Sequence, residues 1–275
     1  MKIARLLTGI VCLFSGPVRA AAPPDSAELM RAGLDAESRL DSGQALEFYL
    51  KADRARPNDS TVLQKIAQQY SDLIVDLHDD AEKKRSAQIA LSYAERAVAL
   101  DPKNAVNVLS LAVCHGKLAS FSDTRRKLEH SRQVKAEAER AIALNPDYAW
   151  AHHVLGRWHC EVAGLSGATR WLIRAVYGRL PAASTAEAIR ELGSAVRLEP
   201  GELAHRLELG FAYLADGQKT NARAEFIAGL AMPSRRKHDE MAKGRARAAF
   251  DNLEKRDGRD PPKLPEERRV LPRDP

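Results

Sequence analysis

The chain has 275 residues, of which 44% are hydrophobic, 29% charged and only 5% aromatic. This is the balance of a soluble globular protein with a sizeable core, and the abundance of Ala, Leu, Arg and Glu favours helices. The net charge of +6 comes from the ends of the chain: three basic residues lie in the first 19 positions, and 13 Lys and Arg face 9 Asp and Glu between Ser234 and Pro275. The region between is close to neutral, which argues against a large cationic groove for nucleic acid.

The first residues have the organisation of a secretory signal peptide. Two basic residues precede an apolar run over 6–14, and Ala20 and Ala22 follow at positions suited to cleavage. We therefore expect a signal peptide over 1–22 and a secreted or periplasmic protein. A mitochondrial presequence fits less well because the apolar block is compact and serine is scarce. No later segment approaches 18 uninterrupted apolar residues, so we expect no membrane span in the mature form.

Four similar phrases end in a proline turn: KADRARPND, RAVALDP, RAIALNP and SAVRLEP, with prolines at 57, 102, 146 and 200. Placing Pro57 at position 32 of the 34-residue tetratricopeptide pattern matches five of the eight marked sites outright. The small residues of that pattern let two helices approach, and the large ones fill the remaining space. The residues placed at the other marked sites are Leu29, Ala32, Gly33, Ala36, Ala45, Tyr49 and Ala52.

Later units keep the small and large residues of the pattern, but the second, third and fourth units are longer than 34 residues. The closing prolines are 45, 44 and 54 residues apart, which indicates insertions of about 11, 10 and 20 residues between the two helices of a unit. A fifth unit ends near Pro233. The sequence therefore predicts an all-α, right-handed tetratricopeptide-like α-solenoid of about five degenerate helix pairs over 26–255. A basic, Pro-rich disordered tail is expected over 256–275.

Three motifs go beyond the generic repeat: LGRW at 155–158, LS at 165–166 and PAASTAEAI at 181–189. With them, the region 60–230 resembles the regulator of microtubule dynamics family. The resemblance implies a helical-repeat protein associated with microtubules, and some eukaryotic members are tethered to mitochondrial or endoplasmic reticulum membranes. The expected signal peptide would make this chain an exported member of bacterial type.

The stretch AHHVLGRWHC, at 151–160, raises the question of a metal site. If its helix begins at Ala149, His152 and His159 fall on packing positions, two turns and about 10.5 Å apart, too far to share one zinc ion. A zinc ion that recruits His115 or Cys114 from the neighbouring helix remains an alternative, as does a disulfide between Cys114 and Cys160.

No catalytic motif stands out elsewhere. The sequence has no G-x-S-x-G, no H-E-x-x-H, no glycine-rich phosphate loop and no C-x-x-C. We therefore predict no catalytic, cofactor-binding or metal-binding residue, and no enzyme. A metal-dependent enzyme built around the His and Cys cluster is the alternative from a different class.

The face of each first helix that lines the inner groove of such solenoids is unusually apolar here, so something should cover it. The candidate partner-binding groove consists of Trp150, His153, Arg157, Leu207, Phe211 and Leu214. The longest insertion contains a short amphipathic segment with Trp171, Leu172, Arg174 and Val176. We expect this segment to pack on the solenoid's own apolar surface; docking to a partner or a membrane is the alternative.

These patterns favour a non-enzymatic protein-interaction scaffold that binds a protein or peptide without nucleic acid or cofactor. The alternative that follows from the resemblance is a microtubule-associated regulator. It would act in the cytoplasm, on the cytoskeleton or at an organelle, and it requires an N-terminus that is not a secretory signal.

Overall fold

The computed structural model describes residues 25–178, 181–256 and 258. Within these ranges the chain forms twelve α-helices and one short 3-10 helix, without a β-strand. The predicted signal peptide, and all but two residues of the predicted tail, lie outside the described residues. The elements are α1 (Ser26–Ser38), α2 (Ser42–Ala55), α3 (Ser60–Leu73), η1 (Ile74–Asp76), α4 (Asp80–Leu100), α5 (Ala105–Ala119), α6 (Thr124–Leu144), α7 (Ala149–Ala163), α8 (Gly167–Tyr177), α9 (Thr185–Leu198), α10 (Leu203–Ala215), α11 (Lys219–Leu230) and α12 (Asp239–Arg256).

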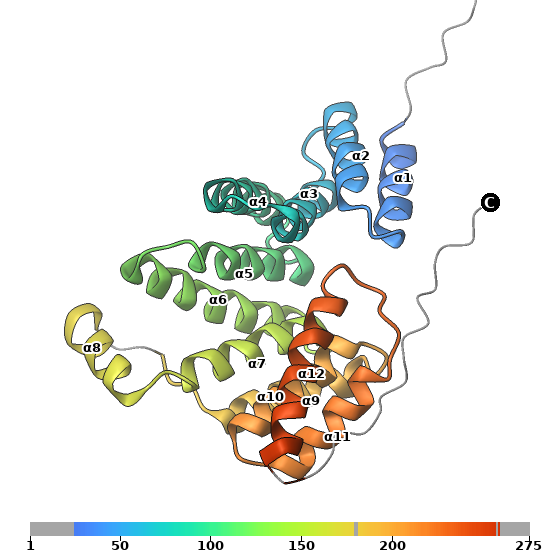
Figure 1. Cartoon of the computed structure of the whole chain (residues 1–275). Helices are drawn as coiled ribbons and strands as arrows, with labels where there is room; N and C mark the ends of the chain where they lie inside the picture. The colour runs from blue at the N-terminus through green and yellow to red at the C-terminus, as the bar shows by residue number, and fades with distance from the viewer. Residues whose placement is uncertain (1–24, 179–180, 257, 259–275) are drawn as a thin grey trace, which may run out of the picture.

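Ten of these helices form five pairs that stack along the chain. α1 packs on α2, α3 on α4, α5 on α6, α7 on α9 and α10 on α11, and each pair contacts the next. In Figure 1 the stack curves from α1 to α11, with α8 projecting from one side. The prediction of an all-α, tetratricopeptide-like fold is confirmed, and α8 and α12 are the two helices outside the five pairs.

Short polar side chains set where most helices begin. A residue just before the helix accepts a hydrogen bond from a backbone N–H of the first turn, which would otherwise lack a partner. The residues that do so before α1 to α6, α8 and α9 are Asp25, Asp41, Asp59, Asp79, Asn104, Asp123, Ser166 and Ser184. These hydrogen bonds stabilise the first turn of each of these eight helices.

Close packing within the pairs follows the small and large residues of the repeat. A Cβ atom at Gly156 would lie 2.6 Å from Leu192 Cγ, and one at Gly210 would lie 2.7 Å from the ring of Phe226. Gly33 faces the ring of Tyr49 in the same way. Real Cβ atoms cannot approach so closely, so these glycines allow the two helices of a pair to come together. The repeat register predicted from the sequence is correct in these three pairs.

The predicted insertions take two different forms. In the second and third pairs they mainly lengthen the second helix, so that α4 and α6 each have 21 residues against 14 in α2. In the fourth pair the insertion forms the separate helix α8 between α7 and α9. In the part of the chain that the structure describes, no helix combines the length and apolarity needed to cross a membrane.

Candidate interaction surfaces

Two of the three histidines of α7, His152 and His159, pack against neighbouring residues. His152 places Nδ1 2.7 Å from a carboxylate oxygen of Glu191 on α9, and Nε2 2.9 Å from the carbonyl of Pro146. The hydrogen bond with Glu191 raises the pKa of His152, because the imidazolium form can donate to both acceptors. His159 is buried with its ring edge-on to Trp158, and burial lowers its pKa. The two side chains meet different neighbours and do not converge.

Cys114 and Cys160, the two cysteines in the described part of the chain, are free thiols, so the alternative disulfide between them is not formed. Cys114 is buried with Sγ 3.7 Å from the Ser71 hydroxyl, and burial raises the pKa of its thiol to about 12. Burial also raises the pKa of Cys160 to about 11. Across the described ranges, no three His, Cys, Asp or Glu side chains are grouped in a way that would hold a metal ion.

The predicted groove face of α7 carries a buried aromatic cluster. His153 Nδ1 lies 2.9 Å from Nδ1 of His205 on α10, and the ring of Trp150 contacts both imidazoles. The guanidinium of Arg236 lies over Trp150, 4.8 Å from the ring centroid. Burial lowers the pKa of His153, and lowers that of His205 to about 4, so both are neutral at pH 7 and one donates to the other.

Arg236 belongs to a segment, residues 231–238, that we call the C-terminal strap. The strap joins α11 to α12, and in Figure 1 it rises from α11 towards the N-terminal helices. Lys237 Nζ lies 2.8 Å from Asp76 of η1, and His238 Nε2 lies 2.9 Å from Asp72 of α3. The strap therefore links the last helix to the second pair. His238 and Asp72 are 166 residues apart in the sequence.

Helix α12 covers the rest of this face at the C-terminal end. Arg245 pairs with Glu208 of α10 and lies 5.1 Å from the centroid of the Phe211 ring. Glu208 also faces Arg157 of α7, with 3.7 Å between Oε2 and Nε. On its inner side α12 buries Phe250 completely in the core formed with α10 and α11.

The structure thus brings the six predicted groove residues to the C-terminal half of the solenoid, where the strap and α12 cover part of them. His153 and Leu207 are buried, and Leu207 packs against Gly229 of α11. The cover expected from the longest insertion comes instead from the strap and α12. The apolar spacing of Ala242, Ala246, Ala249, Phe250 and Leu253 was the signal that sequence analysis missed.

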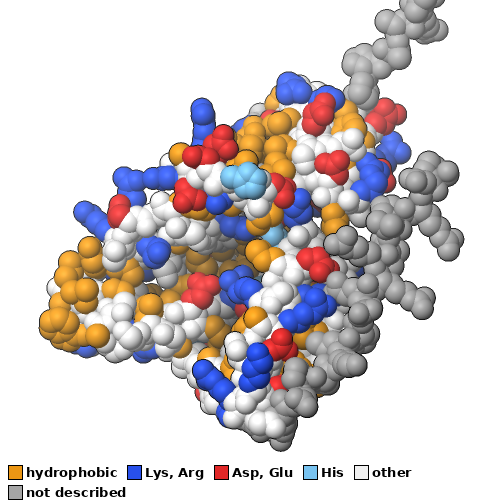
Figure 2. All heavy atoms as spheres, in the orientation of Figure 1, with side chains coloured by type: hydrophobic (Ala, Val, Ile, Leu, Met, Phe, Trp, Pro, Cys, Tyr) orange, Lys and Arg blue, Asp and Glu red, His pale blue; other side chains and the backbone are white. Residues whose placement is uncertain are grey.

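The expectation that the longest insertion packs on the solenoid is wrong for three side chains. Trp171, Leu172 and Val176 are 70%, 55% and 60% exposed, and in α8 only Ile173 is buried. Figure 2 shows hydrophobic side chains gathered over α8, at the edge of the molecule. The predicted amphipathic helix exists, but its apolar face points to solvent.

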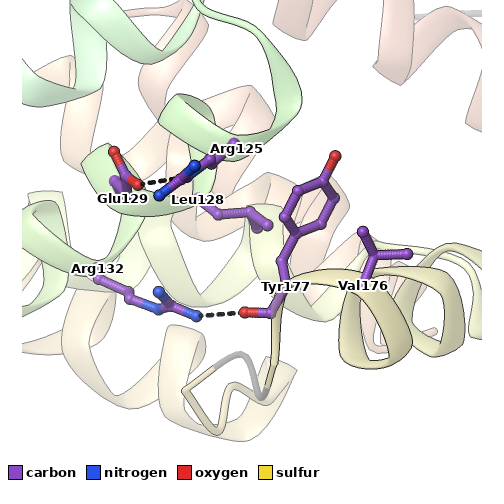
Figure 3. Close-up of a pocket in the computed structure, with 6 residues that line it drawn as sticks. All are labelled: Arg125, Leu128, Glu129, Arg132, Val176 and Tyr177. Carbon is purple, nitrogen blue, oxygen red and sulfur yellow. Dashed lines mark hydrogen bonds and ion pairs between the residues drawn. The ribbon is translucent and has the colours of Figure 1, made fainter.

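Helix α8 is nevertheless held in place at both ends. Ser166 caps its first turn, and Arg170 donates to the carbonyl of Leu165, 3.1 Å away. At the other end, Arg132 of α6 donates to the carbonyl of Tyr177 at 3.3 Å. Figure 3 shows the open cavity of about 400 Å³ between α6 and the end of α8. It is lined by Arg125, Leu128, Glu129, Arg132, Val176 and Tyr177.

Comparison with known proteins agrees with this architecture. The family model described as regulator of microtubule dynamics protein 1-3 matches residues 30–254, nearly all of the helical region. The chain belongs to this family. A crystal structure of a thermophilic tetratricopeptide protein from Thermus thermophilus is similar in fold, with a TM-score of 0.60 and 20% identity over 82% of this chain and 98% of that one.

Individual family members are similar to parts of this chain. Regulator of microtubule dynamics protein 3 of Xenopus laevis is 31% identical over 139 residues, which are 50% of this chain and 30% of that protein. Protein 1 of Mus musculus is 23% identical over 221 residues, 79% of this chain and 72% of that protein. The chain spans only 30% to 40% of the first relatives that it matches. Family membership therefore concerns the helical region.

Proposed function

We propose that the protein is a non-enzymatic scaffold that binds a protein or peptide along the inner face of its N-terminal helix pairs. The observation that carries this proposal is the unequal cover of that face. In the C-terminal half, α12 and the strap lie over this face. α12 is itself an amphipathic helix, so the face can take up a helix of that kind. The corresponding positions of α1 and α5 keep apolar side chains in contact with water.

These apolar side chains occupy the repeat positions that line the inner groove. Leu34 of α1 is 44% exposed and Val106 of α5 is 41% exposed, while Met30 and Val113 are half-buried. Exposed apolar residues on the groove-lining faces of the first and the third helix pair favour a partner segment with apolar side chains that contacts both. An amphipathic helix or an extended apolar peptide has the required chemistry.

Photo-cross-linking in the native host tests this proposal. A photoreactive residue is placed at Leu34 or at Val106, and control proteins carry it at the exposed Glu47 of α2 or Glu139 of α6. We expect one adduct of the same mass from both groove sites and none from the controls. Adducts that do not depend on the site, or none at all, would overturn the proposal.

The second candidate function is the regulation of microtubules, which the name of the family supports for its members. Co-sedimentation of the purified protein with stabilised microtubules tests it. Saturable binding that a Leu34→Glu substitution reduces would favour this function and assign it to the same face. Protein that stays in the supernatant with saturating microtubules would exclude it.

We also propose that the protein works outside the cytoplasm of a bacterial-type host. The support is the sequence pattern over 1–22, with basic residues, an apolar run and small residues in that order. Sequencing the N-terminus of protein purified from its host should give a start at Ala21 or Pro23. An intact Met1 on cytosolic protein would contradict export.

A further inference from the structure

Helix α8 has the composition of a helix that lies in the surface of a membrane. It contains Arg170 and Arg174, no acidic residue, and apolar side chains that include Trp171. Its 11 residues span roughly 16 Å, about half of a bilayer's apolar thickness, so it could lie along a membrane but not cross it. Short cationic amphipathic helices with tryptophan on the apolar face bind at such interfaces.

The arrangement of α8 on the molecule suits a flat surface. The helix projects beyond the stacked pairs, and its exposed apolar side chains point outward rather than into a groove (Figures 1 and 2). A peptide partner would need a concavity with matching walls, whereas a bilayer can enclose a protruding helix. The burial of Ile173 and the hydrogen bond from Arg132 of α6 to the carbonyl of Tyr177 keep α8 beside the body of the molecule, with its other large apolar side chains exposed.

The neighbouring end of α6 adds positive charge. Over 124–132 the sequence TRRKLEHSR has four Lys and Arg against one Glu. Arg125 and Arg132 line the cavity beside α8, and Arg125, Arg126 and Lys127 are exposed. Glu129 pairs with Arg125, and Asp123, just before α6, faces Arg126 at 3.9 Å. The excess of cations beside an apolar face is complementary to anionic lipid headgroups.

From these observations we propose that α8, together with the first turns of α6, docks the protein onto an anionic lipid bilayer. Leu172 and Val176 would enter the apolar boundary with Trp171 at the headgroup level, and Arg174 and the α6 cations would face the lipid phosphates. This binding surface is separate from the inner face that we propose for a protein partner.

Vesicle flotation with the full chain tests this surface. The probes are vesicles of phosphatidylcholine alone and vesicles with one third phosphatidylglycerol. We expect flotation with the anionic vesicles only, and weaker flotation at high salt. The triple variant Trp171→Ser, Leu172→Ser, Val176→Ser should bind at least about tenfold more weakly, and Arg174→Gln about fivefold more weakly.

A matched control replaces three exposed apolar residues on other helices, Leu100→Ser, Ile227→Ser and Met241→Ser, which are 47%, 41% and 55% exposed. This variant should bind like the wild type. Tryptophan fluorescence provides a second readout, because Trp158 is buried, Trp150 is half-buried and Trp171 is 70% exposed. Anionic vesicles should shift the emission to shorter wavelength, and Trp171→Phe should abolish the shift.

Three results would overturn the proposal. One is a wild-type protein that does not float with anionic vesicles. Another is a triple variant that binds them as well as the control variant does. The third is a wild-type dimer in sedimentation velocity that becomes monomeric in the triple variant without any vesicle binding. In that case a second copy of the chain, rather than a bilayer, covers α8.

Discussion

Helices α8 and α12 both stand outside the five pairs, yet the chain treats them in opposite ways. α12 buries Phe250 and Ala246 against α10 and α11. In α8 the apolar and polar side chains are divided more sharply between two faces of the helix than in α12, but α8 buries only Ile173. An amphipathic pattern shows that a helix has a face to cover and does not say what covers it.

The difference comes from the surfaces that each helix can reach. The eight-residue strap places α12 on the apolar side of the last pair, where Gly229, Leu207 and Phe226 complete a core. α8 is tied to the ends of α7 and α9, which already pack directly on each other. Experiments that separate packing from exposure can therefore test the comparison at each helix.

The largest effect is expected in α12. Phe250→Ala removes a fully buried ring from the C-terminal core and should lower the free energy of unfolding by about 3–5 kcal/mol. Met241→Ala, on the exposed side of the same helix, should change it by less than about 0.5 kcal/mol. Denaturant unfolding of both variants measures the difference. Equal effects would mean that α12 does not pack as described.

The next effect concerns the histidine pair beneath the strap. Because burial lowers the pKa of His205 to about 4, the unfolded chain, with a pKa of about 6.5, binds a proton over this range that the folded chain does not. The contribution of this histidine to the free energy of unfolding is fully present above about pH 6.5. It falls as the pH is lowered towards 4, by at most about 1.4 kcal/mol per pH unit for each such histidine.

The test compares the unfolding of the wild type and of His205→Gln at pH 7.5 and pH 5. The variant should lose less stability on acidification than the wild type. His115, whose pKa burial also lowers to about 4, contributes equally to both proteins. Identical losses would show that His205 does not stay neutral in the folded protein.

The next prediction concerns the stability of the contact between α7 and α9, the two helices that precede and follow α8 in the chain. A side chain at Gly156 must displace Leu192 and approach the carbonyl of Ala188, so Gly156→Leu should cost about 1–3 kcal/mol. Gly167→Leu, at a position with open space around its Cβ, serves as the control for the size change. An unchanged melting temperature for Gly156→Leu would contradict the packing of this pair.

The smallest effect is expected in α8. Serine at Trp171, Leu172 and Val176 removes side chains that make few contacts, so the melting temperature should stay within about one degree of the wild type. Ile173→Ser should lower the melting temperature more, because the side chain of Ile173 is only 7% exposed. A marked loss of stability in the triple variant would restore the view that α8 packs on the solenoid.

The sequence alone determined the repeat and its register. The spacing of small and large residues specifies which side chains meet inside a pair, as Gly210 and Phe226 do, because those contacts are local and recur with the period. The resemblance to the family came from three motifs that go beyond the repeat, at 155–158, 165–166 and 181–189. The periodicity also placed His152 and His159 among packing residues rather than on a metal.

Only the tertiary structure decided which helix covers the inner face. α8 and α12 both present apolar faces in the sequence, and periodicity cannot rank them because the contacts that hold α12 are not periodic. His238 meets Asp72 and Lys237 meets Asp76, so the strap contacts the second pair across the three pairs that follow it. Such contacts form only after the stack has curved enough to bring the strap near the second pair, so their positions depend on the accumulated geometry of the pairs between them.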